Sequence, residues 1–295
     1  MTTRGIDRLA VVAAAFLFST GGVVIKATNW NGFAVAGGRS AVAALVLLML
    51  MPSWRRFWQP KALVVGSAFG ATMILFVIAN KLTGAANAIF LQSTAPLYVL
   101  ALAPWLLGER NEVSDVLLTA VLAVGMGCFF VGREPPAATA TDPALGNRVA
   151  AAAGFTWAWT LVGLRWLARR DPDNTPTAGS SNLAGAAVVA GNVIAFAVCV
   201  PLALPLPAVT PADLGLVAYL GIFQIGVAYL LIHRGIAGVP ALEAALLLLL
   251  EPVLATVLAW SILNERPGPW ALAGCGVILA GTLGRTWMAA RRTEA

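Results

Sequence analysis

Residues 95–110 read APLYVLALAPWLLGER, and residues 251–266 read EPVLATVLAWSILNER. In each stretch a glutamate stands 13 residues after a proline and is followed by an arginine. Beyond each stretch, a glycine stands 16 residues after that glutamate. The matched positions are Pro96, Glu109 and Gly125 in one copy, and Pro252, Glu265 and Gly281 in the other. Apolar sequences match one another easily, but agreement of these residue types at one offset predicts an internal duplication.

The composition of the chain is that of a membrane protein. Of its 295 residues 59% are apolar and 11% are charged, with a mean hydropathy of +0.84, whereas soluble domains carry about 25% charged residues. A spanning helix needs about 20 apolar residues, so the chain has room for about ten spans and none for a separate soluble domain. The net charge of +6 comes from arginines in short loops, where they orient helices. We therefore expect no nucleic-acid partner.

Apolar runs between charges, prolines and asparagines predict ten spanning helices in an all-α membrane protein. The predicted spans are Leu9 to Ile25, Phe33 to Met51, Leu63 to Ile78, Ala85 to Leu107, Val116 to Val131, Val149 to Leu167, Leu183 to Leu204, Leu214 to Ile232, Val239 to Leu263 and Trp270 to Trp287. The first run follows a basic start, as in a signal peptide, but it has no clear cleavage site, and we expect it to be an uncleaved span.

A connector rich in proline, alanine and threonine, GREPPAATATDPALGN at residues 132–147, predicts the boundary between two halves, 1–131 and 148–295. Five spans in each half would insert the second copy upside down. Lysines and arginines fall 13 to 5 in favour of the side that holds the N-terminus, which predicts that both termini are cytoplasmic. The expected fold is two inverted five-helix repeats around a central cavity.

The sequence resembles the drug/metabolite transporter superfamily, in particular its ten-helix members built from two EamA-type repeats. The residues that carry the resemblance are Arg39, Pro96 followed by Gly108-Glu109-Arg110, and Glu251-Pro252 followed by Asn264-Glu265-Arg266. It extends from about Leu9 to Trp287 and is nearest to bacterial exporters of aromatic amino acids and related metabolites. The resemblance implies export across a bacterial inner membrane, through a basket in which the fifth and tenth helices lie outside.

The chain departs from the small four-helix multidrug relatives, which carry a carboxylate in their first helix to exchange protons for cationic drugs. Neither Leu9 to Ile25 nor Val149 to Leu167 contains a carboxylate. We hypothesise that the protein does not use that chemistry. Uptake of lipophilic cations into inverted vesicles, driven by a pH gradient, would contradict the hypothesis.

Polar and aromatic side chains within the spans are candidates for lining the cavity, because polar groups are costly in hydrocarbon. The candidate substrate-binding residues are Ser19, Thr20, Phe76, Asn80, Gln92, Thr94, Tyr98, Trp157, Trp159, Phe223, Gln224 and Tyr229. Pro96 should expose the carbonyl of Gln92. Amides with aromatic walls suit a zwitterion that has an apolar side chain. Helix packing, an interhelical polar network and aromatic filling of the bundle are the alternatives for these residues.

Three charged residues within the spans are candidate titrating or structural groups: Arg39, Glu243 and Glu251. Arg39 could pair with backbone carbonyls or extend to the surface, or it could face the cavity. Glu251 is either a protonated group bonded across helices or a titrating group exposed to the cavity. His233, beside Arg234, is expected to be an ordinary residue of the membrane interface.

The expected function is a small-molecule transporter that exports aromatic and other neutral amino acids by alternating access. A multidrug or lipophilic-cation exporter is the alternative, with Glu243 and Glu251 as its negative sites. A membrane enzyme would need catalytic constellations that one histidine and two carboxylates in the spans do not supply, so no catalytic residue is assigned. A channel would need a ring of charged residues or a glycine-rich filter loop. Neither appears in the sequence, so a carrier is favoured over a channel.

We expect no cofactor and no metal. The cysteines Cys128, Cys199 and Cys275 are expected to be packing residues. Membrane lipid and a small-molecule substrate are the expected partners of a monomer. Small residues at Gly66 and Gly70, and at Gly276, Ala280 and Gly284, predict close helix packing. For the tenth helix this packing could instead join two subunits.

Overall fold

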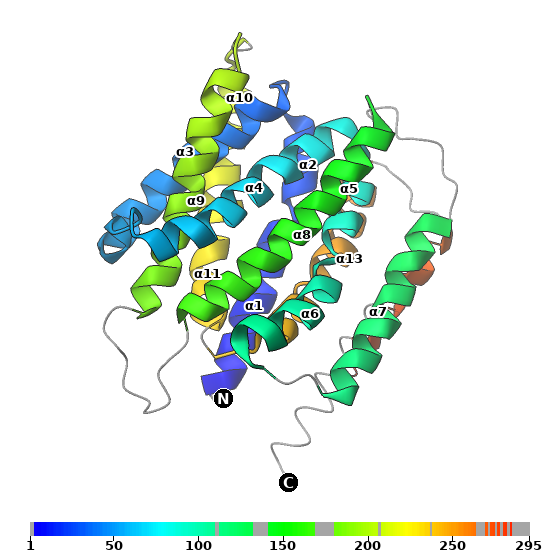
Figure 1. Cartoon of the computed structure of the whole chain (residues 1–295). Coiled ribbons are helices and arrows are strands. Elements are labelled where there is room, and N and C mark those ends of the chain that lie inside the picture. The colour runs from blue at the N-terminus through cyan, green and yellow to red at the C-terminus, as the bar shows by residue number, and fades with distance from the viewer. Residues whose placement is uncertain are drawn as a thin grey trace.

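The computed structural model describes residues 3–109, 112–131, 141–168, 180–205, 208–236 and 238–263, with scattered residues between 269 and 284. Every regular element in these ranges is helical (Figure 1). The first part of the chain forms α1 (Thr3–Ser19), α2 (Gly21–Ala27), α3 (Gly32–Leu50), η1 (Pro52–Arg55), α4 (Pro60–Leu82), α5 (Ala85–Gln92), α6 (Ala95–Leu107) and α7 (Val113–Val131). The second forms α8 (Pro143–Ala168), α9 (Ser180–Leu202), α10 (Pro211–Tyr219), η2 (Leu220–Val227), α11 (Ala228–Ile236), α12 (Ala241–Leu247) and α13 (Leu250–Leu263).

Seven helical stretches of the described chain are long and apolar enough to cross a membrane. They are Gly5–Ala27, Gly32–Leu50, Pro60–Leu82, Ala88–Leu107, Leu183–Leu202, Pro211–Ile236 and Glu243–Ile262. The all-α, multi-pass membrane fold is thus confirmed, while the count of ten and the inversion of the halves stay predictions. Helix α8 is not among the seven; it carries Arg148 and Arg165 and packs against α4, α5, α6 and α9, so neighbouring helices cover much of it.

Three of the predicted spans are interrupted, a fourth contains a π-helical segment, and the sixth begins earlier than its apolar run indicates. The first breaks at Thr20, the fourth at Ser93 and Thr94, and the ninth at Leu248 and Leu249, whereas the eighth passes through the π-helical segment η2. Helix α8 begins at Pro143 instead of Val149 because the Asp142 side chain accepts the Leu145 amide, an N-cap followed by a proline. The end of the predicted connector is therefore helical, and residues 132–140 lie outside the described ranges.

Helices α4 and α9 pack closely through small residues. A Cβ atom on Gly66 would lie 2.7 Å from the Cβ of Ala190 and 2.9 Å from the carbonyl oxygen of Ala187, and one on Gly70 would lie 2.8 Å from the carbonyl oxygen of Gly191. Thr72 adds a hydrogen bond of 2.9 Å from its hydroxyl to that of Thr156 on α8. The predicted small-residue face of this span thus packs inside the bundle.

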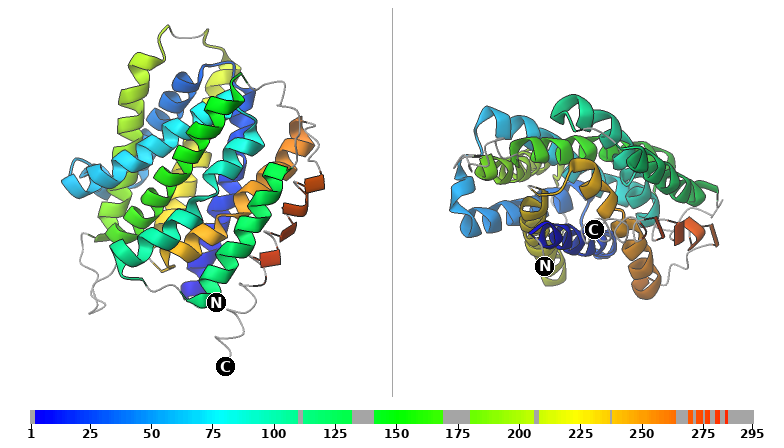
Figure 2. Two further views of the ribbon diagram at one scale, coloured as in Figure 1. Left: turned by 45° about the vertical axis from the view of Figure 1, so that its right-hand side comes forward. Right: turned by 90° about the horizontal axis from the view of Figure 1, so that it is seen from below.

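Helix α7 stands at the edge of the bundle, beside the described residues between 269 and 284 (Figures 1 and 2). A Cβ atom on Gly281 would lie 3.2 Å from Leu122 and 3.3 Å from Leu118. No described atom lies within 4 Å of a Cβ built on Gly276 or Gly284. The position of α7 agrees with what the family resemblance implies for the fifth helix, while much of the predicted tenth span lies outside the described residues.

Candidate functional site

Two interrupted helices face each other in the middle of the bundle. Helix α5 ends at Gln92 and α6 begins at Ala95, while α12 ends at Leu247 and α13 begins at Leu250. Each break lies just before one of the duplicated prolines, Pro96 or Pro252, and proline supplies no amide hydrogen to continue the helical ladder. Interrupted helices are tolerated at membrane depth only where protein or a cavity surrounds the freed backbone groups.

Side-chain hydroxyls donate hydrogen bonds to some of the backbone carbonyls at the break between α5 and α6. The Ser93 hydroxyl donates to the carbonyl of Ile89 at 2.7 Å, and that of Thr94 donates to the carbonyl of Leu91 at 2.7 Å. Helix α8 comes close through Gly154, where a Cβ atom would lie 2.8 Å from the Leu91 carbonyl oxygen and 3.2 Å from that of Gln92. Thr94 therefore caps the break, and the predicted exposed carbonyl of Gln92 faces α8.

A cavity of about 10 Å³ lies between the two breaks. Its lining consists of Gln92, Ser93, Ala95, Pro96, Trp157, Ala245, Leu248, Leu249 and Glu251. A second cavity, of about 20 Å³, is lined by Phe18, Met73, Phe76, Gln92, Trp157, Gln224, Ile225, Tyr229 and Glu251. We call the two together the central chamber, because they share Gln92, Trp157 and Glu251. Each has room for about one water molecule, so the protein is closed around the chamber in this conformation.

Aromatic rings form one wall of the chamber. Trp157 on α8 and Tyr229 on α11 lie edge-to-face at 6.2 Å between ring centroids, and Phe18 on α1 contacts them at 6.1 and 5.2 Å. Phe69 packs behind Tyr229 at 4.6 Å. Sequence reasoning missed Phe18, Met73 and Ile225, which line the second cavity, because nothing local distinguishes an apolar residue facing the chamber from one facing another helix.

Two polar side chains of the chamber have atoms without a partner. Glu251, in the first turn of α13, is 7% exposed, and its carboxylate makes no hydrogen bond or ion pair to any described residue. The Oε1 atom of Gln92 is buried, and within the described chain nothing donates to it. Such groups are costly in a protein interior, and both open onto the same space.

Arg39 lies fully buried behind the second cavity. Its Nη1 donates to Gln224 Oε1 at 3.0 Å, its Nη2 donates to the carbonyl of Met73 at 2.9 Å, and its guanidinium lies 5.8 Å from the centre of the Phe76 ring. Of the predicted alternatives, the structure shows the pairing with a backbone carbonyl. Arg39 thus joins α3 to α4 and to the π-helical segment, and it fixes Gln224 at the cavity wall.

The other predicted site residues lie away from the central chamber. Ser19 and Thr20 donate to the carbonyls of Phe16 and Leu17, and Thr20 also accepts from the Tyr219 hydroxyl, as the packing alternative expects. Asn80 donates to the carbonyl of Phe76. Trp159 is half-buried and lines neither cavity. Tyr98 is 36% exposed and packs on Phe155, and Phe223 is 46% exposed and stacks on Tyr219.

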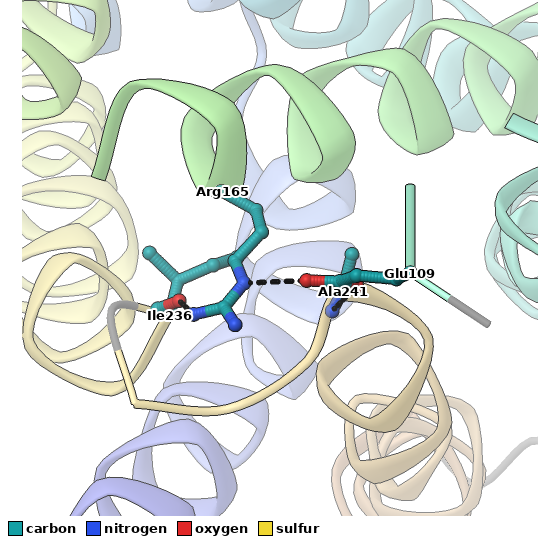
Figure 3. A network of polar contacts seen from close by, with 4 residues as sticks. All are labelled: Glu109, Arg165, Ile236 and Ala241. Atoms are coloured by element: carbon teal, nitrogen blue, oxygen red, sulfur yellow. Dashed lines mark hydrogen bonds and ion pairs between the residues drawn. The ribbon is translucent and has the colours of Figure 1, made fainter. Parts of the chain in front are cut away.

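The end of the bundle that holds the start of α1, here called the N-terminal end, is joined by ion pairs. Arg165 Nε donates to Glu109 Oε1 at 2.9 Å, its Nη1 donates to the carbonyl of Ile236, and the amide of Ala241 donates to Glu109 Oε2 (Figure 3). Glu243, predicted as a possible titrating group, accepts from Arg8 Nε at 2.6 Å. His233 packs against the buried Trp54 ring.

The opposite end, where α2, α4 and α9 finish and α8 and α10 begin, is joined by hydrogen bonds to backbone groups. Lys26 donates to the carbonyl of Thr83, and Lys81 donates to that of Thr28 at 2.8 Å. Asp213 accepts the Asn29 amide at 2.9 Å and the Thr210 hydroxyl at 2.7 Å. The two lysine bonds lie within the first half of the chain, whereas the bond between Asn29 and Asp213 joins the two halves.

A further cavity, of about 250 Å³, lies elsewhere, between α3 and α9, and its lining is apolar. It is formed by Trp30, Phe33, Ala34, Gly37, Gly38, Phe196, Cys199, Val200, Ala203 and Leu204. Phe196, Val200 and Leu204 are 43 to 63% exposed, so this cavity faces the outside of the bundle and contains none of the predicted site residues. Cys128 and Cys199 are free thiols, and Cys275 lies outside the described ranges.

Comparisons with known proteins agree with the two-part organisation. The model of the EamA-like transporter family matches residues 7–131 and 144–286. The chain is 25% identical over 287 residues to an uncharacterized transporter, YwfM, of Bacillus subtilis (strain 168), covering 93% of this chain and 92% of that protein. A solved structure described only as the crystal structure of a protein matches with a TM-score of 0.72 and 22% identity, over 98% of this chain and 99% of the other. That likeness supports the fold.

Proposed function

The chain belongs to the EamA-like transporter family, whose members move small molecules across membranes, and we propose that its substrates are aromatic and other neutral amino acids, carried by alternating access. The central chamber supports this proposal. It lies between the two family-matched segments: Gln92 comes from the first, and Trp157 and Glu251 from the second. A cavity between two repeats is where a rocking motion can expose a substrate to either side in turn.

The lining of the chamber is the observation that carries the substrate class. One wall presents the rings of Trp157 and Tyr229, which can receive an apolar or aromatic side chain. The amides of Gln92 and Gln224 and the carboxylate of Glu251 are the polar groups around it. A few convergent polar groups in an otherwise apolar cavity are typical of a site for a small amphipathic molecule.

The closed conformation fits the carrier mechanism. Cavities of about 10 and 20 Å³ cannot hold an amino acid, since small-molecule sites measure about 300 Å³ or more. The halves must therefore separate at one end to admit a substrate. The ion pairs at the N-terminal end and the hydrogen bond between Asn29 and Asp213 at the opposite end are the contacts that would break in turn.

Lipophilic cations are the second candidate substrates, and Glu251 favours them because a buried carboxylate on an aromatic chamber could bind a cation without a carboxylate. Glu243 supports this candidate less, because Arg8 already neutralises it. The two candidates differ in one group: an amino acid carries a carboxylate beside its amine, and a lipophilic cation carries none.

Counterflow in liposomes that contain the purified protein would test the proposal. Vesicles preloaded with unlabelled leucine or phenylalanine should accumulate the labelled amino acid, and Trp157→Ala should reduce this exchange at least tenfold while Phe155→Ala, a substitution of an exposed ring on the same helix, leaves it unchanged. Exchange of lipophilic cations alone, with none of amino acids, would overturn the proposal in favour of the second candidate.

Export from the cytoplasm across a bacterial inner membrane is part of the proposal, together with a cytoplasmic location of both termini. The excess of arginines and lysines on the side that holds the N-terminus supports this orientation. Labelling of single cysteines near the two termini in intact cells would test it. Labelling of either terminus from outside would contradict it.

A further inference from the structure

Glu251 is a carboxylate that has no counter-charge within the described chain. Its side chain is 7% exposed, it opens onto both cavities of the central chamber, and no described residue donates to it. An ionised carboxylate in such surroundings is costly unless a cation or hydrogen-bond donors accompany it. The site is therefore incomplete as the chain alone forms it.

No described cationic side chain forms an ion pair with Glu251. Arg39 donates to Gln224 and to the Met73 carbonyl. Arg8 and Arg165 pair with Glu243 and Glu109 at the N-terminal end of the bundle. No arginine or lysine is among the residues that line either described cavity of the chamber. A molecule that enters the chamber can therefore bring a positive charge into contact with Glu251.

A second acceptor and aromatic rings surround the same space. The Oε1 atom of Gln92 is buried without a donor in the described structure, and Gln92 lines both cavities together with Glu251 and Trp157. A primary ammonium group carries three donors and no acceptor, and it is attracted to the faces of aromatic rings. An acid, an amide oxygen and an indole ring together match that group.

We propose that Glu251 and the Oε1 atom of Gln92 form a subsite for the primary ammonium group of the substrate, with Trp157 closing one side. The subsite deepens the proposed function, on which it rests, since it names the part of the amino acid that is recognised. It sets an order among ligands: an amine should bind with or without a neighbouring carboxylate, while an acid that lacks the amine should not bind.

Three probes with one phenyl side chain test this order on the purified full-length protein: phenylalanine, phenethylamine and 3-phenylpropionate. A ligand that binds the folded protein raises its unfolding temperature, and the rise grows with the ratio of the ligand concentration to Kd. We expect both phenylalanine and phenethylamine to raise it, and phenylpropionate to have an effect at least tenfold weaker at equal concentration. Equal stabilisation by phenethylamine and phenylpropionate would overturn the subsite.

Variants then assign the effect to the named side chains. Glu251→Gln keeps the shape and removes the charge, and it should weaken binding of phenethylamine at least tenfold without lowering the unfolding temperature of the unliganded protein. Gln92→Leu should weaken binding about threefold. Glu112→Gln, which removes an exposed carboxylate at the start of α7, is the matched control and should change nothing. Unchanged binding to Glu251→Gln would overturn the subsite.

The outcomes separate the subsite from the proposed function. Binding of phenethylamine that depends on Glu251, without counterflow of any amino acid, would support the subsite and overturn amino-acid transport. Counterflow of amino acids with the same apparent affinity in Glu251→Gln would support amino-acid transport and overturn the subsite.

Discussion

The two ends of the bundle are closed by different chemistry. At the N-terminal end Glu109 from the first family-matched segment binds Arg165 and the amide of Ala241 from the second (Figure 3). Arg8 from the first segment likewise binds Glu243 from the second. At the opposite end hydrogen bonds join the two segments, from the amide of Asn29 to Asp213 and from the side chain of Asn31 to the carbonyl of Ala203.

The difference bears on how each end opens. The N-terminal contacts join charges across the two segments, and separation leaves a charge without its partner in a partly buried place. The contact between Asp213 and Asn29 at the opposite end pairs one charged side chain with a neutral backbone amide, so its separation breaks a charge-assisted hydrogen bond and no ion pair. The N-terminal end should therefore be the more firmly closed of the two, and the following predictions test this comparison. All of them use single cysteines in a variant that lacks the native cysteines, labelled by a small water-soluble thiol reagent.

Arg165→Met should have the largest effect. It removes the ion pair with Glu109 and the hydrogen bond to the Ile236 carbonyl, and we expect it to destabilise the closed N-terminal end by about 2 kcal/mol. Labelling at Ala245→Cys, in the chamber wall, should become about 30-fold faster. Exchange of the two charges, Glu109→Arg with Arg165→Glu, should restore slow labelling. Unchanged labelling in Arg165→Met would show that this ion pair does not hold the N-terminal end closed.

Asp213→Ala should loosen the opposite end by a smaller amount. The change removes the acceptor of the Asn29 amide and of the Thr210 hydroxyl, at a cost of about 1 to 2 kcal/mol. Labelling at Val23→Cys, which lines a small cavity near that end, should rise about tenfold. The rate at Ala245→Cys should not rise, and an equal increase at both positions would indicate general unfolding instead of opening at one end.

Glu243→Gln should have a weaker effect at the N-terminal end than Arg165→Met. It replaces one charge-assisted hydrogen bond to Arg8, whose side chain is 24% exposed, and such partly solvated pairs contribute about 1 kcal/mol. Labelling at Ala245→Cys should accelerate about fivefold. A larger effect than that of Arg165→Met would show that Arg8 and Glu243 are the main closing contact.

Salt should produce the smallest change and should separate the ends without any mutation. Raising the ionic strength from about 0.1 to 1 M shortens the screening length from about 10 to 3 Å. Labelling at Ala245→Cys should rise about twofold because partly exposed ion pairs weaken, while labelling at Val23→Cys changes less. The reverse order would contradict the assignment of charge pairs to the N-terminal end.

Much of the candidate site could be found from single residues, because a polar group in an apolar span is conspicuous. Gln92, Trp157, Gln224, Tyr229 and Glu251 were predicted in this way, and they all line the central chamber. The same signal also selected Tyr98 and Phe223, which face outward. Polarity within a span indicates that a residue needs a partner or water, but it does not say on which side of the helix that partner lies.

The partners of the charged residues could not be predicted in detail. Glu109 stood out only as part of a repeated Glu-Arg pair, yet it binds Arg165, 56 positions along the chain, and Glu243 binds Arg8, 235 positions away. Phe18 and Met73 reach the chamber as ordinary apolar residues of their helices. Contacts of this kind depend on how each helix is rotated about its own axis, because the rotation decides which side chains face the chamber. The average hydropathy of a span does not depend on that rotation.

By itself the sequence determined that the chain is helical and crosses a membrane several times, since long apolar runs can satisfy their backbone groups in lipid only as helices. It did not determine where helices break, because Pro96 and Pro252 lie at interruptions whereas Pro104 lies inside the continuous helix α6. Only the tertiary structure decided that the two breaks face each other and that Glu251 opens onto the space between them. The rotation of each helix is set by side-chain packing against all its neighbours at once, which no local pattern contains.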